Sequence, residues 1–237
     1  MNLSIADNLA HVQAQIEAAC QAAGRPVSSV RLLAVSKTWG PEAVRAAHAA
    51  GQTAFGENYI QEAVDKIQAL QDLPLEWHCI GPIQSNKTRL VAEHFDWVHS
   101  VDRLKIAQRL SEQRPDHLPP LQVCIQVNVD GGATKSGVAP QDLPALAQAV
   151  AALPRLQLRG LMTIPDPAEN PAQMRAVHAR AKALFDALCQ QGLLLDTLSM
   201  GMSGDMEAAI AEGSTLVRVG TAIFGARQAG HGGAAVD

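Results

Sequence analysis

The sequence lacks the features by which several large classes of protein are recognised. No apolar run approaches the roughly 20 residues that a membrane-spanning helix needs, and the N-terminus carries Asp7 and His11 where a signal peptide has a basic start and an apolar middle. The 19 Lys and Arg residues are scattered among 23 Asp and Glu residues, and the formal net charge is -4. We therefore expect a cytoplasmic protein whose main partner is neither nucleic acid nor a membrane.

Motifs for metals, redox chemistry and dinucleotides are also missing. The four cysteines lie far apart and form no CxxC pair, so we expect no metal site and no redox motif. We interpret the cysteines as small buried hydrophobic residues. No GxGxxG follows the first apolar run, which disfavours a dinucleotide-binding fold.

What the sequence does contain is a regular alternation of short apolar runs and helical segments. A chain of 237 residues with 47% hydrophobic residues is large enough for one compact domain. Strict alternation implies a parallel sheet, and eight strand-helix units in a chain of this length predict an α/β fold, a single-domain (β/α)8 TIM barrel over residues 1–237. The predicted strands are residues 31–36, 53–56, 76–81, 97–101, 121–129, 157–164, 196–201 and 215–220.

The two ends of the chain depart from this repeat. At the N-terminus, apolar residues from Ile5 to Cys20 recur at helical spacing, with Ser4 as a possible cap and Gly24 as a stop, so we expect an extra helix within residues 1–24. At the C-terminus, residues 228–237 are rich in Gly and Ala, and we expect a flexible tail with no second domain behind it.

Lys37 is the first candidate functional residue, because functional groups of a TIM barrel come from the C-terminal ends of the strands. It follows the first apolar run in "LLAVSKTWGPEAV", just before a helix that begins at Pro41 and Glu42. The dipole of that helix disfavours a cation at its start. Partial burial would lower the pKa of this lysine, and a neutral amine can form a Schiff base with an aldehyde. The alternative is an ordinary solvated lysine.

The loops after the seventh and eighth predicted strands are typical of a phosphate site. Ser203 and Gly204 lead into a helix after the seventh strand, and Gly220 and Thr221 do so after the eighth. Helix N-termini with free N–H groups bind phosphate, and these two loops form the recurrent phosphate site of TIM barrels. Either loop taken alone is equally compatible with a simple helix cap.

Arg218 lies inside the eighth predicted strand, where a parallel barrel strand is normally apolar. Two-residue alternation places it on the same face as Leu216 and Gly220. If that face points into the barrel, Arg218 is a buried cation that needs an acceptor, and an aromatic ring nitrogen would serve. A lysine that captures aldehydes, a phosphate site and a ring-facing arginine together match pyridoxal 5'-phosphate.

The sequence also resembles the pyridoxal phosphate homeostasis proteins, the YggS/PROSC group of fold type III. The similarity covers nearly the whole chain in order. It is carried by the motifs "LLAVSKT", "FGENYIQEA", "WHCIGPIQSNK", "GLMTIP" and "LSMGMSGDMEAAIAEGSTLVRVGTAIFGAR".

The resemblance implies a role for each motif residue. Lys37 would carry the cofactor as an internal aldimine, and Arg218 would face the pyridine nitrogen. Asn58 and Met200 would line the pocket with His78 nearby, although a hydrogen-bonded core histidine is an equally good interpretation of His78. The phosphate would lie on Ser203, Gly204, Gly220 and Thr221.

Three further residues need separate interpretation. Cys79 and Thr163 stand where Phe and Ala are frequent in the family, and Cys79 should point away from His78 and alter packing only. Lys135, in the loop "NVDGGATKSG", lacks the spacing of a P-loop. A solvated loop lysine is the favoured interpretation of Lys135, and a minor role in receiving or releasing the cofactor is a hypothesis.

The same residues favour a carrier over an enzyme. Arginine only donates hydrogen bonds and stays charged, so Arg218 would keep the ring nitrogen unprotonated and the ring would be a poor electron sink. A racemase of this fold type needs a second base, which is a tyrosine in alanine racemase. The one tyrosine in this sequence is Tyr59, beside the proposed pocket residue Asn58. We expect a monomer that binds pyridoxal phosphate and hands it to apoenzymes. The alternatives are a pyridoxal phosphate-dependent amino-acid racemase and a cofactor-free Schiff-base aldolase.

Overall fold

The computed structural model describes residues 3–131 and 136–226. Lys135 and the tail 228–237 lie outside the described residues, so the predictions made for them stay predictions.

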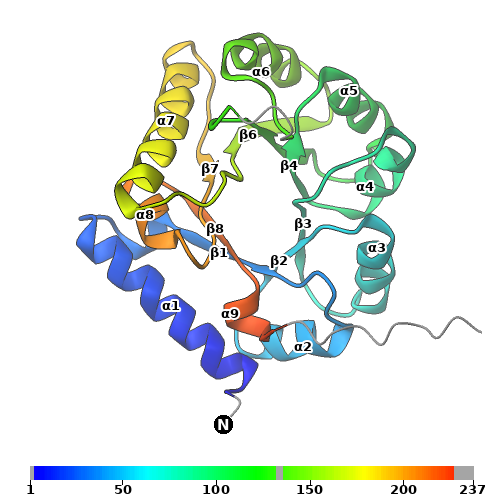
Figure 1. Ribbon diagram of the computed structural model, residues 1–237. Helices are drawn as coiled ribbons and strands as arrows, with labels where there is room; N and C mark the ends of the chain where they lie inside the picture. Colours follow the sequence, from blue (N-terminus) through cyan, green and yellow to red (C-terminus); the bar gives the residue numbers. More distant parts are fainter. Residues whose placement is uncertain (1–2, 132–135, 227–237) are drawn as a thin grey trace, which may run out of the picture.

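Eight parallel strands close into a barrel in the order of the sequence, which confirms the predicted TIM barrel (Figure 1). Six strands are shorter than predicted, and β5 and β7 differ the most. β5 ends at Gln126 instead of residue 129, and β7 ends at Ser199, shortly before Gly201 turns the chain with a φ of 102°. The strands are β1 Arg31–Val35, β2 Ala54–Glu57, β3 Glu76–Cys79, β4 Trp97–Val101, β5 Leu121–Gln126, β6 Leu156–Met162, β7 Thr197–Ser199 and β8 Leu216–Val219.

The helices form a ring around the barrel, as Figure 1 shows. The predicted N-terminal helix is α1, which packs against α2, α8 and α9, and the Ser4 hydroxyl caps it by accepting from the Asp7 N–H at 3.1 Å. Within the described part of the chain, the helices are too short or too polar to cross a membrane. Their bounds are α1 Ile5–Ala22, α2 Pro41–Ala49, α3 Ile60–Ala69, α4 Thr88–His94, α5 Leu104–Gln113, α6 Leu143–Ala151, α7 Pro171–Gln190, α8 Met206–Ala211 and α9 Thr221–Phe224, with 3-10 turns at Val27–Ser29, Ser85–Lys87 and Pro140–Asp142.

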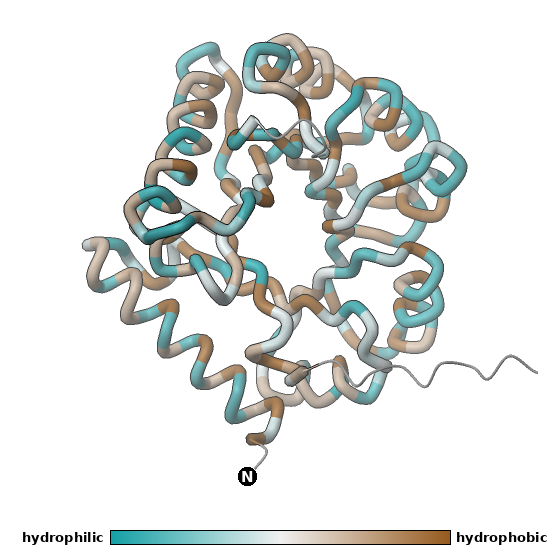
Figure 2. The backbone as a smooth tube through the Cα atoms, in the orientation of Figure 1, coloured by the Kyte–Doolittle hydropathy of each residue, from teal (hydrophilic) through white to brown (hydrophobic). Residues whose placement is uncertain are grey.

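The molecule has two separate interiors. The larger lies between the sheet and the helices and is apolar, because alternate strand residues such as Leu32 and Ala34 meet the hydrophobic faces of the helices. Figure 2 shows hydrophobic and hydrophilic residues alternating around the turns of those helices. In the barrel interior, the described residues form two small apolar clusters, one around Leu33 and one around Trp97. Polar residues fill the remaining space, namely His78, His99, Ser199 and Arg218, all of them buried.

Candidate active site at the mouth of the barrel

The residues predicted for the site come from five strands that are neighbours in the closed sheet, in the order β7, β8, β1, β2, β3. In the pairing register Ala34 of β1 lies opposite Val219 of β8, and Val35 lies opposite Gly56 of β2. The chain segments that follow β1, β2 and β8 therefore leave the sheet side by side. This arrangement gathers the predicted lysine, asparagine and phosphate loops at one part of the barrel mouth.

Lys37 stands where β1 leaves the sheet, and both of its neighbours are anchored. The Ser36 N–H donates to the Gly56 carbonyl at 3.0 Å. Thr38 has a φ of 70°, in the left-handed region that is rare for a β-branched residue, and its N–H donates to Glu62 Oε1 at 2.7 Å. The turn thus holds the half-buried Lys37 between two fixed points.

A charged cluster is buried directly behind this turn, between the barrel and α3. Lys66 Nζ donates to the Ser36 carbonyl at 2.9 Å and to Glu62 at 3.3 Å, and it forms a close ion pair with Glu57 Oε1. Burial raises the pKa of Glu57 to about 7, and the Lys66 ammonium opposes that rise. This cluster was not predicted, although Lys66 lies within a predicted helix on the face that is buried in the structure.

Asn58 follows β2 next to Lys37 and is positioned by a close backbone approach. A Cβ atom at Gly81 would lie 2.5 Å from the Asn58 carbonyl oxygen, so only glycine fits there. Asn58 Oδ1 is buried and has no hydrogen-bond partner among the described residues. A buried amide oxygen without a partner is costly, and it suggests that a ligand supplies the missing donor.

Arg218 points into the barrel, as the alternation of β8 predicts. Its side chain is 4% exposed and donates to Ser199 Oγ and to the Thr163 carbonyl, each at 2.8 Å. Burial lowers the pKa of Arg218 to about 10, with Asp205 acting in the opposite direction. The guanidinium therefore stays charged at neutral pH. Ser199 was not among the predicted site residues, because nothing in the sequence indicates that it contacts Arg218, 19 positions away.

The two predicted phosphate loops lie at the starts of short helices. Ser203 and Gly204 are exposed in the turn before α8, where Asp205 Oδ1 accepts from the Met202 N–H at 2.7 Å. Thr221 is exposed and begins α9. The first N–H groups of a helix have no partner within the helix, which applies to the starts of α8 and α9.

Gly220 ties the second of these loops to the lysine strand. A Cβ atom at Gly220 would lie 3.1 Å from the Val35 carbonyl oxygen, so the end of β8 packs directly on the end of β1.

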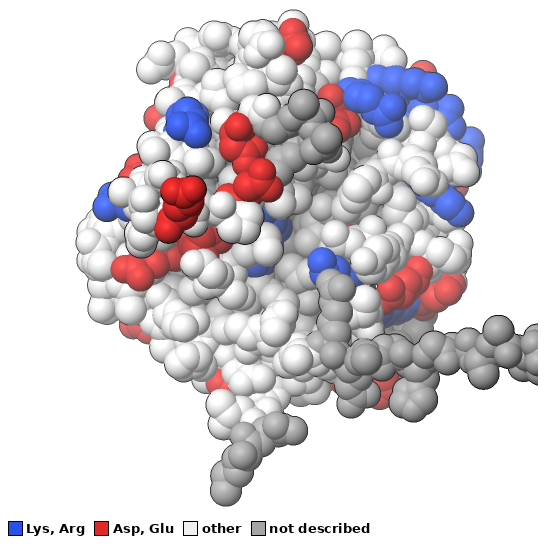
Figure 3. All heavy atoms as spheres, in the orientation of Figure 1, with Lys and Arg blue, Asp and Glu red and all other residues white. Residues whose placement is uncertain are grey.

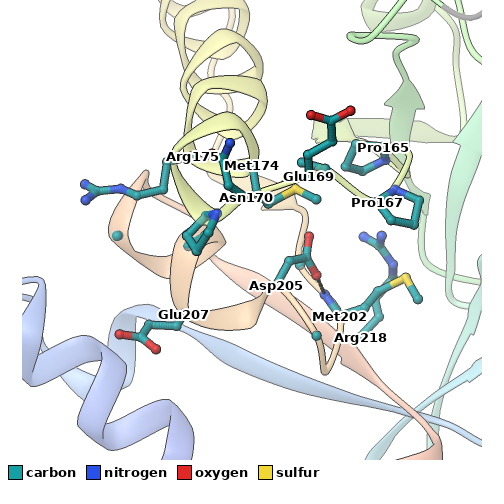
Figure 4. A pocket seen from close by; sticks show the side chains of 16 residues that line it. Pro165, Pro167, Glu169, Asn170, Met174, Arg175, Met202, Asp205, Glu207 and Arg218 are labelled. Atoms are coloured by element: carbon teal, nitrogen blue, oxygen red, sulfur yellow. Dashed lines mark hydrogen bonds between the residues drawn. The ribbon is translucent and has the colours of Figure 1, made fainter.

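A cavity of about 830 Å³ opens beside these loops. Figure 4 shows the Arg218 side chain pointing from β8 toward the loop that carries Pro167. Figure 3 shows this face of the molecule hollowed over the barrel, with basic side chains in the hollow and acidic side chains along the rim over α7 and α8. The residues that line the cavity include Gly201, Met202, Gly204, Asp205 and Arg218 together with Pro165 and residues 167–171, from a Pro-rich loop that was not predicted as part of the site.

Of the predicted site residues, Gly204 and Arg218 line this cavity. Met200 and His78 are fully buried. Met200 has no exposed surface and packs in the large apolar layer outside the barrel, so among the described residues its side chain is not part of the cavity lining. His78 is fully buried inside the barrel, where its ring nitrogens lie 2.8 Å from His99 and 2.6 Å from Glu76. Its neighbour Cys79 points to the outer layer, as predicted.

Comparisons with known proteins agree with one another. Residues 8–228 match the sequence profile of the alanine racemase N-terminal domain family. The chain is 65% identical to a pyridoxal phosphate homeostasis protein of Pseudomonas aeruginosa, over 96% of this chain and 97% of that relative. It also resembles the solved structure of PipY from Synechococcus elongatus with pyridoxal phosphate bound, at 42% identity and a TM-score of 0.83, over 94% of this chain and all of that chain.

A more distant likeness concerns the fold alone. The solved alanine racemase of Corynebacterium glutamicum is 20% identical, with a TM-score of 0.68, and the match covers 94% of this chain and 60% of that one.

Proposed function

The chain belongs to the family of the pyridoxal phosphate homeostasis proteins, and from that premise we propose that it binds pyridoxal 5'-phosphate at the barrel mouth as a carrier. When bound, this cofactor supplies an aldehyde that condenses reversibly with amines. The Lys37 amine is the group that we assign to hold it. Support comes from the position of Lys37, half-buried on an anchored turn between the ends of β8 and β2.

The residues at the mouth fit the rest of the cofactor. Ser203, Gly204, Gly220 and Thr221 would bind the phosphate through hydroxyl and N–H donors at the two helix starts. Arg218 would donate to the ring nitrogen, and Asn58 would bind a polar ring substituent through its unpartnered oxygen. His78 has both ring nitrogens engaged, so we assign it an indirect role.

One observation carries the proposal more than any other. Arg218 is a permanent cation in a barrel interior, yet among the residues that the structure describes its hydrogen-bond acceptors are one hydroxyl and one carbonyl. Five N–H donors are available on a guanidinium, and a buried cation with so few acceptors favours a ligand that supplies another. A cofactor-free aldolase would have no use for such a group.

The same arginine favours a carrier over a racemase. Because Arg218 can only donate, it would keep the ring nitrogen unprotonated and so limit the stabilisation of negative charge on the ring. A second base is also needed for racemisation, and Tyr59 is 51% exposed at the start of α3. We therefore propose slow chemistry at most, with delivery to apoenzymes as the role, by a monomer in the cytoplasm. Four free cysteines suit that compartment.

The absorption spectrum of the purified protein mixed with pyridoxal phosphate tests the proposal. We expect a visible band that Lys37→Ala abolishes and that Lys182→Ala, a change in the middle of α7 beside Gly213, leaves intact. A band that survives in Lys37→Ala would overturn the assignment of Lys37.

Exchange of the amino-acid α-proton with solvent deuterium then separates carrier from racemase. We expect exchange far below common enzyme turnover of about 1–1000 per second. Exchange within that range for several amino acids would replace the carrier by the racemase.

A further inference from the structure

A continuous line of hydrogen bonds crosses the barrel interior from Arg218 to the opposite end. Arg218 donates to Ser199 Oγ at 2.8 Å, and His99 Nδ1 lies 2.8 Å from the same oxygen. His99 Nε2 lies 2.8 Å from His78 Nδ1, and His78 Nε2 lies 2.6 Å from Glu76 Oε1. We call these five residues the interior relay.

The relay runs the length of the barrel. Arg218 lies near the C-terminal end of β8 and lines the cavity, and Ser199 ends β7. His99 is at the middle of β4, while Glu76 is the first residue of β3. At that far end Glu76 also pairs with Arg31, the first residue of β1, at 2.8 Å. The relay therefore joins the candidate site to the opposite surface.

The chemistry of the two ends fixes the direction of every hydrogen bond between them. Arg218 can only donate, and an ionised Glu76 can only accept. His78 Nε2 must therefore carry the proton that it gives to Glu76, so Nδ1 of a neutral His78 accepts from His99 Nε2. His99 Nδ1 in turn accepts from the Ser199 hydroxyl, whose oxygen accepts from Arg218. All donors point the same way, and both histidines carry their proton on Nε2.

This pattern requires His78 and His99 to be neutral and Glu76 to be ionised, and the surroundings of the three side chains favour these states. Burial lowers the pKa of His78 and lowers that of His99 well below its usual value, so both rings are neutral. The hydrogen bond from His78 and the Arg31 guanidinium hold the pKa of Glu76 at about 2. The His78 ring is also stacked on Trp97, with centroids 5.1 Å apart and planes at 12°.

We propose that Ser199, His99 and His78 are positioning residues for Arg218. The relay holds one N–H of the guanidinium on Ser199, so that the remaining donors keep a fixed orientation toward the ligand in the cavity. This inference rests on the proposed function for the identity of that ligand, pyridoxal phosphate. It goes further in naming the residues that orient the ring-facing cation. Two of them, His78 and His99, are fully buried and do not line the cavity.

Histidine tautomers measured by long-range ¹H–¹⁵N NMR test the relay without any cofactor. We expect both His78 and His99 to be neutral at pH 7, with the proton on Nε2. A proton on Nδ1 alone, or a charged ring, at either residue would overturn the proposed direction of the relay. Because the protein is measured without cofactor, a failure of the proposed function would leave this result unaffected.

Ser199→Ala tests the positioning role in the presence of pyridoxal phosphate. Loss of a hydrogen bond to a charged group costs about 1.5–3 kcal/mol, so we expect the Kd to rise about tenfold or more and the visible band to move. Ser199→Thr keeps the hydroxyl and should restore both. Ser111→Ala removes another buried hydroxyl, on α5, and controls for lost stability.

Two outcomes would contradict the positioning role. One is a Ser199→Ala protein whose affinity and band match those of Ser111→Ala. The other is a Ser199→Ala protein with the same affinity and band as Ser199→Thr.

Discussion

Two buried polar networks lie on opposite sides of the barrel wall, and they are built differently. Inside, each successive pair of residues in the interior relay is joined by a hydrogen bond of 2.6–2.8 Å, and the relay runs from a cation to an anion. Outside, the cluster of Ser36, Glu57, Glu62 and Lys66 is compact, but Glu57 Oε2 has no partner among the described residues.

The difference indicates different roles for the two networks. A fully hydrogen-bonded network is rigid, because each bond fixes the orientation of the next group. The interior relay therefore suits the orientation of Arg218. The outer cluster holds the backbone on either side of Lys37 through Ser36 and Glu62, and its buried carboxyl titrates near neutral pH. We expect the relay to act on the ring end of the ligand and the cluster to act on the lysine.

Removal of the cation from the outer cluster should have the largest effect. Lys66→Met leaves Glu57 buried without a counterion, which costs about 3–5 kcal/mol of unfolding free energy. Urea unfolding at pH 8 measures it. The double variant Lys66→Met with Glu57→Leu removes the stranded charge and should recover most of the loss. If Lys66→Met were as stable as the wild type, Lys66 would not be the counterion that stabilises the buried Glu57 carboxylate.

The pH dependence of the unfolding free energy should distinguish Glu57 of the outer cluster from Glu76 of the interior relay. The pKa of Glu57 in the folded state is raised to about 7 from the usual 4.5, so the folded protein binds more protons between these values. The stability due to this shift is present below about pH 4.5 and is lost as the pH rises through 7, by on the order of 3 kcal/mol. Glu57→Gln should flatten the curve from pH 5 to 8, and an unchanged slope would refute this.

The inner carboxyl should show the opposite sign. The pKa of Glu76 is lowered to about 2 from 4.5, so its contribution is present above pH 4.5 and is lost as the pH falls toward 2. The side chain is 35% exposed, and solvent screening reduces the effect to about 1 kcal/mol. Acid unfolding of Glu76→Gln should lack this component, and a stronger acid sensitivity in the variant would contradict the account.

The smallest effect concerns the hydroxyl in the outer cluster. Ser36 Oγ donates to Glu57 Oε1 at 3.2 Å, and Ser36→Ala removes one of the carboxylate's few partners. We expect a loss of about 1 kcal/mol in urea unfolding. A loss close to that of Lys66→Met would mean that the hydroxyl, and not the ammonium, holds the cluster together.

The fold was predictable because each strand carried its own apolar run, and β7 was overestimated because the chain turns at a left-handed Gly201 that only the structure reveals. Lys37 and Arg218 were predictable because cations in or after apolar strands stand out in a sequence.

The partners of these cations were not predictable. Ser199 and His99 are 100 residues apart and meet only through barrel closure. The orientation of Met200 was not predictable either, because either Ser199 or Met200 could have pointed into the barrel. In the structure Ser199 points into the barrel, and Met200 points outward.

Borohydride reduction followed by peptide mapping tests directly whether Lys37 is the residue that binds the aldehyde of pyridoxal phosphate. The protein is mixed with pyridoxal phosphate, reduced and digested, and the modified residue is identified by mass spectrometry. We expect one dominant reduced adduct, on Lys37, that is absent from Lys37→Ala. Reduced adducts spread over exposed lysines, with Lys37 unmodified, would contradict this assignment.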